Sequence, residues 1–87
     1  MNTFKLTVSS PDGNKFVGDV IKLDVRGTEG ELAIMAGHVP FVTSLVECPC
    51  TIWLEDGEQM KATATGGLLT VSHDQVTLLS SSFKFDK

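Results

Sequence analysis

The side chains that could take part in catalysis or binding are concentrated in residues 27–45, GTEGELAIMAGHVPFVTSL. Glu29 and Glu31 are two positions apart, so on an extended backbone both side chains would project from one face. Paired carboxylates suit acid–base chemistry or cation binding, although a solvated or partner-binding face is their commoner use. His38 could act as a general base, but no nucleophile lies near it in a recognisable motif. We therefore favour loop packing or a partner contact for this histidine.

Two cysteines, Cys48 and Cys50, flank Pro49 and leave three states open. A disulfide between residues two apart would close a very small, strained ring. A zinc site would need His38 or His73 as further ligands. Unpaired thiols fit a reducing compartment and are the state that we favour.

The other candidate motifs have structural explanations. His73 and Asp74 stand in a predicted turn, where aspartate serves the turn itself. The Gly66–Gly67 pair lies between two predicted strands, and no helix N-terminus follows it to bind a phosphate. The sequence therefore predicts no catalytic, cofactor or metal residues, and an interaction module is the default class.

Composition narrows the class of protein further. The chain has 87 residues, of which 41% are hydrophobic and 21% charged, as in one ordinary globular domain. Its net charge is −4 and its basic residues are scattered singly, which argues against nucleic-acid binding. No apolar run approaches the ~20 residues of a membrane helix, and no secretory signal is visible at the N-terminus.

Alternating hydrophobicity predicts short strands throughout the chain. Apolar and polar residues alternate at residues 3–9, 19–26 and 59–65, the period of a half-buried strand. Gly18 suggests a bulge or corner between two strand pieces. Residues 41–46 follow a proline and are rich in β-branched side chains, so we expect a strand rather than a helical turn there.

The fold class follows from these short strands and the turns between them. Turns every eight to twelve residues and no necessary helix predict an all-β, antiparallel sandwich or flattened barrel. We expect the domain to occupy residues 1–82 and residues 83–87 to form a polar C-terminal tail.

An ordered set of motifs then resembles a known family. The set begins with GTEGEL at residues 27–32, passes Gly37–His38 and Pro40, and ends with TGGL at residues 65–68 and Leu78–Leu79. Together these motifs resemble the N-terminal β-sandwich domain of the epsilon subunit of the F-type ATP synthase. The similarity runs from Phe4 to Leu79.

The resemblance implies a ten-stranded sandwich and a non-catalytic role in the central stalk, or rotor, without a cofactor. Such a subunit docks gamma onto the polar loops of the c-ring and couples ion translocation to ATP synthesis or hydrolysis. Its contact with the catalytic alpha/beta head is indirect. The implied location is the cytoplasmic face of the bacterial plasma membrane, as a peripheral part of the complex.

The same resemblance suggests partners for individual residues. The c-ring-facing residues would be Glu29 and Glu31. The gamma-facing residues would be Ser10, His38, Val42 and Thr43. The alternative is a free-standing β-sandwich binding module that uses His38 with Glu29 and Glu31.

One departure from the family concerns the C-terminal region. Epsilon chains usually continue into a C-terminal helical hairpin, whereas this sequence stops at Lys87. We therefore expect no helical hairpin, and neither an inhibitory function nor a nucleotide site is carried over.

Overall fold

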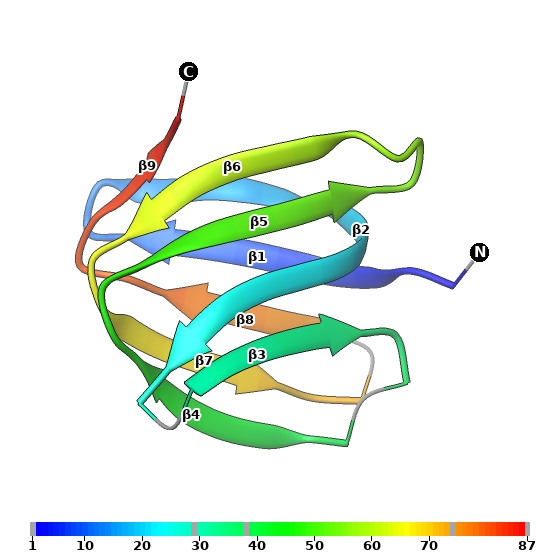
Figure 1. The fold of residues 1–87 in the computed structure, drawn as a ribbon, viewed down its shortest axis with the longest axis horizontal. Coiled ribbons are helices and arrows are strands. Elements are labelled where there is room, and N and C mark those ends of the chain that lie inside the picture. Colours follow the sequence, from blue (N-terminus) through cyan, green and yellow to red (C-terminus); the bar gives the residue numbers. More distant parts are fainter. Residues whose placement is uncertain (1, 29, 38, 74, 87) are drawn as a thin grey trace.

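The chain forms strands and turns only, within the residues that the structure describes. This computed structural model describes residues 2–28, 30–37, 39–73 and 75–86, and Figure 1 shows their arrangement. None of them belongs to a helix long or apolar enough to cross a lipid bilayer. The nine strands are β1 (Phe4–Ser10), β2 (Gly13–Gly27), β3 (Gly30–Met35), β4 (Phe41–Leu45), β5 (Cys48–Leu54), β6 (Gln59–Ala64), β7 (Gly67–Val71), β8 (Gln75–Leu79) and β9 (Phe83–Phe85).

The strands pack as two layers that share β2. In one layer the first half of β2 pairs with β1, and β8, β7 and β4 follow in that order. In the other, the second half of β2 pairs with β3 and β5, and β6 and β9 follow. Figure 1 shows β5, β6 and β3 in front of β1, β8 and β7. The β-sandwich class is confirmed, and every pairing is antiparallel except the parallel β1–β8 pair.

The passage of β2 between layers corrects two sequence predictions. The strand is continuous through Gly18, and its irregularity lies where Val20 pairs with Leu54 and Lys22 pairs with Trp53. The extra residue at this bulge reverses the inward–outward alternation, so even positions point inward before it and odd positions after it. Because one strand serves both layers, the described residues form nine strands where ten were expected.

The core fills the space between the layers. The predicted alternation of apolar and polar residues forms this core, because the residues that face inward from each strand are apolar. Its largest fully buried side chains come from six strands: Leu6, Val8, Val20, Leu23, Ile34, Cys50, Ile52, Leu69, Val76 and Leu78.

The last strand differs from the predicted polar tail. Phe83 is only 3% exposed and pairs with Ala64 of β6. Its ring packs edge-on against Phe85, with 5.3 Å between the ring centroids. These residues alternate around Lys84 as a short edge strand, so the sandwich continues beyond residue 82.

Candidate interaction surfaces

The β2–β3 hairpin projects a charged pair from one corner of the sandwich. Gly30 begins β3 at φ +127°, a conformation that side-chain-bearing residues rarely adopt. One step from it, Glu31 stands opposite Arg26, with 3.6 Å between the carboxylate Oε1 and the guanidinium Nη2. The glutamate side chain is 82% exposed. The hairpin therefore presents Glu31 to solvent in an open ion pair.

The hairpin is fixed to the neighbouring layer through β4. The amide of Thr28 donates to the carbonyl of Ser44 at 3.2 Å, and the amide of Val46 donates to the carbonyl of Arg26 at 3.3 Å. Figure 1 shows the hairpin end beside β4. Glu31 is consequently carried on a backbone that is hydrogen-bonded to both layers of the sandwich.

An uncharged face covers part of the outside of the first layer, next to the exposed Lys5 and Asp19, which stand opposite each other on β1 and β2. Two adjacent cross-strand rows run over β4, β7, β8, β1 and β2, and no charged side chain stands at a paired position in either row. Lys15, the extra residue of the bulge in the β1–β2 pairing, lies at their β2 end. Four of its large apolar side chains are 39–62% exposed. Such a surface is typical of a partner interface. We define the uncharged face as Thr7, Ser9, Val17, Val42, Ser44, Leu68, Thr70, Thr77 and Leu79.

The outside of the second layer has different chemistry. Asp24 accepts a hydrogen bond from the Trp53 indole at 2.8 Å and lies 3.7 Å from the ammonium of Lys22. That ammonium also lies 5.4 Å from the centroid of the Trp53 ring. We define the charged face as Lys22, Asp24, Arg26, Glu31, Trp53, Lys61 and Lys84. The two sides of the sandwich are therefore chemically distinct.

Val42 and Thr43 lie on opposite sides of β4, although both were assigned to one partner. Val42 is 62% exposed and pairs with Thr70 on the uncharged face. Thr43 pairs with buried Leu69, and its hydroxyl lies beside Gly27 of the hairpin. Both residues line a hollow of about 440 Å³ between the hairpin and β4.

The other predicted site residues fall into two groups. Ser10 ends β1, and its hydroxyl lies 3.5 Å from the carbonyl of Gly13, to which it donates. It therefore stands at the turn beside the uncharged face. Glu29 and His38 lie outside the described residues.

Sequence reasoning missed three residues that dominate the uncharged face. Val17, Leu68 and Leu79 are 52%, 39% and 46% exposed. A signal for the two leucines was available in the doublets 68–69 and 78–79. Adjacent strand residues point to opposite faces, so each doublet must place one leucine outward.

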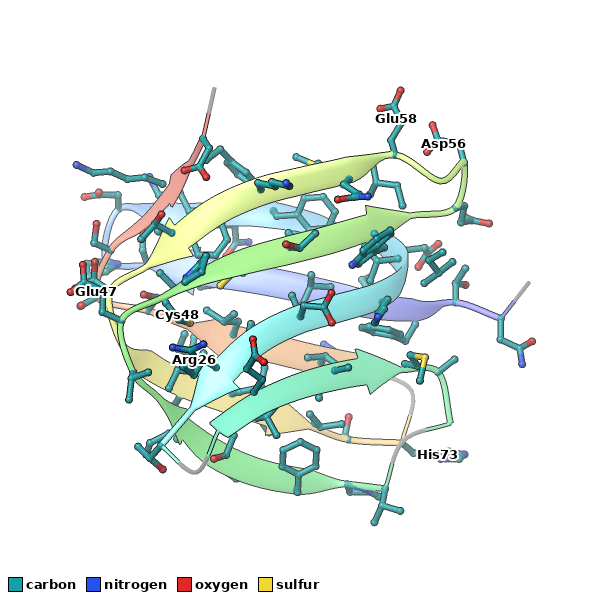
Figure 2. The ribbon with its side chains drawn as sticks, viewed as in Figure 1. Arg26, Glu47, Cys48, Asp56, Glu58 and His73 are labelled. Carbon is teal, nitrogen blue, oxygen red and sulfur yellow. The ribbon has the colours of Figure 1, made fainter. Side chains whose placement is uncertain are left out.

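The cysteines are free thiols buried in the core. Burial, the neighbouring charge of Cys48 and a hydrogen bond to it raise the pKa of Cys50 to about 12. The amide of Arg26 donates to the Cys48 sulfur at 3.4 Å, and Figure 2 shows these two residues side by side. Within the described part of the chain, no three potential ligand side chains gather into a metal site.

These features define an all-β sandwich domain with two chemically distinct outer faces. The family model for the β-sandwich domain of the ATP synthase delta/epsilon chain matches residues 3–85. The chain therefore belongs to this family.

Curated relatives agree with this assignment. The chain is 33% identical to an ATP synthase epsilon chain of Wolbachia pipientis wMel, over 100% of this chain and 77% of the relative. It is 35% identical to an ATP synthase epsilon chain of Bacillus velezensis, over 94% of this chain and 61% of the relative. The chain thus spans only part of the length of these relatives.

Solved structures confirm the fold. A chain of the Euglena gracilis mitochondrial ATP synthase (OSCP/F1/c-ring) matches with a TM-score of 0.91 and 22% identity, over 95% of this chain and 53% of that chain. A chain from the central stalk and c-ring of the Tetrahymena thermophila mitochondrial ATP synthase matches with a TM-score of 0.75 and 15% identity, over 91% and 63%. At these identities the likeness concerns the fold.

Proposed function

We propose that this domain is a non-catalytic subunit in the rotor of an F-type ATP synthase. It docks gamma onto the polar loops of the c-ring and so couples ion translocation to ATP synthesis or hydrolysis. Its contact with the alpha/beta head is indirect. As part of that complex it lies peripherally at the cytoplasmic face of a bacterial plasma membrane.

The uncharged face carries this proposal, beyond family membership. Val42, which the resemblance assigns to gamma, is 62% exposed there, and Ser10 stands at its border. Exposed apolar side chains that gather in adjacent rows without paired charges are typical of a surface that binds another protein. We therefore assign this face to gamma.

The hairpin supports the second half of the proposal. Glu31 is exposed at a corner of the molecule and is fixed through β2 to both layers. An exposed carboxylate of this kind orients docking onto basic loops more than it adds affinity. We assign the hairpin to the c-ring, and the family resemblance adds Glu29 to the residues expected to contact it.

Co-purification tests the proposal. An affinity-tagged chain isolated from its source should bring gamma and the catalytic head with it. Val42→Asp places a charge on the uncharged face and should abolish this association. Met35→Asp is the matched control, because Met35 is 52% exposed on the outside of β3 and lies away from that face. A wild-type chain recovered as a lone monomer would favour the free-standing binding module instead.

A further inference from the structure

A hollow of about 420 Å³ opens at one end of the uncharged face. It lies where the β1–β2 turn meets the start of β7 and the end of β8. Its apolar wall consists of Pro11, Leu68 and Leu79, and the two leucines stand directly opposite each other on paired strands. The hollow is large enough to receive one side chain from another molecule.

A glycine forms part of the lining of this hollow. Gly67 begins β7 at φ +141°, and a Cβ there would overlap the carbonyl oxygen of Leu79. Only glycine allows the start of β7 to lie this close to the end of β8. At Gly67 the lining of the hollow is therefore closely packed backbone.

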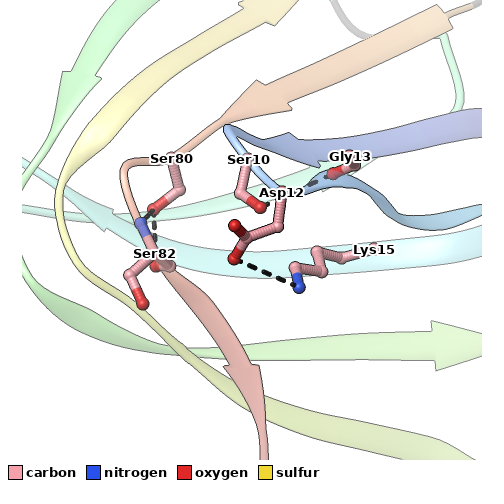
Figure 3. A network of polar contacts seen from close by, with 6 residues as sticks. All are labelled: Ser10, Asp12, Gly13, Lys15, Ser80 and Ser82. Atoms are coloured by element: carbon pink, nitrogen blue, oxygen red, sulfur yellow. Dashed lines mark hydrogen bonds and ion pairs between the residues drawn. The ribbon is translucent and has the colours of Figure 1, made fainter.

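The serine hydroxyls at the rim of the hollow form hydrogen bonds within the chain. The Ser80 hydroxyl donates to the carbonyl of Gly66 at 2.8 Å, and the Ser81 hydroxyl donates to the carbonyl of Thr65 at 2.7 Å. Figure 3 shows Ser80 hydrogen-bonded with Ser82, close to the β1–β2 turn. A hydroxyl has a single proton to donate. These two serines therefore have no proton left for a polar ligand.

The remaining groups nearby are satisfied in the same way. The Ser9 hydroxyl donates to the side-chain oxygen of Asn14 at 2.7 Å. Asp12 on the β1–β2 turn and Lys15 near the start of β2 form an ion pair with each other at 3.9 Å, which Figure 3 also shows. The hollow thus selects for an apolar, uncharged occupant.

We infer that this hollow receives one aliphatic or aromatic side chain of gamma and anchors it on the uncharged face. The inference rests on the proposed function, and it adds the position of the strongest contact. An apolar side chain buried in a formed hollow, surrounded by neutral contacts, is the usual arrangement of an energetic anchor. The charge-free rows around the hollow require an equally uncharged partner surface.

Matched variants test the inference. Leu79→Ser should weaken binding to gamma-containing F1, purified without this chain, by about tenfold or more. Val17→Ser should change the dissociation constant by about twofold at most, because Val17 is similarly exposed on the same face but lies outside the hollow. Leu68→Ser repeats the first test should Leu79→Ser melt at a lower temperature than the wild type.

A second measurement needs no partner. Indole added to the isolated wild-type chain should shift the ¹³C-methyl resonances of Leu68 and Leu79 and leave those of Val17 and Val42 in place. Shifts spread over the whole face, or none, would contradict a specific apolar hollow.

The two proposals fail in different ways. Equal, small effects of Leu79→Ser and Val17→Ser, with tight wild-type binding, would overturn the anchor and leave the rotor assignment intact. Failure of the wild-type chain to bind gamma-containing F1 would overturn the rotor assignment itself.

Discussion

The buried thiol of Cys50 makes stability depend on pH in the alkaline range. Its pKa is raised from 9.0 to about 12, chiefly by burial. Between these values the unfolded chain loses a proton that the folded chain keeps. The stabilisation is thus complete below pH 9 and is lost as pH rises towards 12, by at most about 1.4 kcal/mol per pH unit. Urea unfolding at about pH 8 and about pH 10.5 measures this loss.

The control for this effect is Cys50→Ala. The variant leaves a small cavity and is less stable at every pH, but it lacks the titrating thiol. Its free energy of unfolding should therefore fall less steeply over the same pH range. Parallel slopes for wild type and variant would show that other groups cause the loss.

At the scale of the element, the close approach of β7 and β8 requires a glycine at position 67. Gly67→Ala forces the start of β7 away from the Leu79 carbonyl. Gly13→Ala is the matched control, because φ is +120° at Gly13 and no atom lies within 4 Å of an added Cβ. Both variants bear backbone strain, but only the first also bears overlap, which typically costs about 1–3 kcal/mol more. Chemical denaturation measures both, and equal losses would refute the overlap argument.

Much of the strand pattern could be predicted because alternation is a local property. The alternation of Phe4, Leu6 and Val8 located β1, and that of Ala62 and Ala64 located β6. The position of the bulge in β2 could not be predicted. Gly18 looked like the irregular point, whereas the bulge is set by which strand lies opposite Val20 and Lys22. That pairing is a tertiary property that one strand does not encode.

The end of the sandwich shows a second limit of local patterns. Residues 80–87 contain three serines and two lysines, which favours a polar tail. Phe83 becomes a strand residue only because β6 offers it an edge and the core offers it a buried position. Pairing between distant segments outweighs local composition here.

At the scale of the whole molecule, the two layers turn local alternation into two separate surfaces. The family resemblance suggested Ser10 and Val42 as gamma-facing residues, but the sequence could not show that Val42 lies on the uncharged face and that Ser10 stands beside it. The family resemblance also placed Val42 and Thr43 together, although adjacent residues of a predicted strand point to opposite faces, as these two do in β4. The uncharged face can be recognised only from the register of β4, β7, β8 and β1, because that register brings its residues together.

The proposed assignment of the hairpin to the c-ring and of the uncharged face to gamma leads to a prediction for the assembled complex. Glu31→Lys should weaken docking on the c-ring and lower ATP-driven ion pumping in membrane vesicles. The new cation would face Arg26 across the hairpin in place of their ion pair, which is 3.6 Å long. Because both side chains are exposed, this change should cost the isolated fold less than about 1 kcal/mol. Binding to gamma should persist, since the uncharged face is unaltered.

Arg26→Gln separates loss of the ion pair from loss of the carboxylate. This variant breaks the same pair but leaves Glu31 free to meet a basic loop, so pumping should stay near the wild-type level. Reduced coupling in Glu31→Lys with normal coupling in Arg26→Gln would assign the docking role to the carboxylate. Unchanged coupling in Glu31→Lys vesicles would remove Glu31 from the c-ring contact. Equal losses in both variants would instead show that the hairpin acts through its internal ion pair.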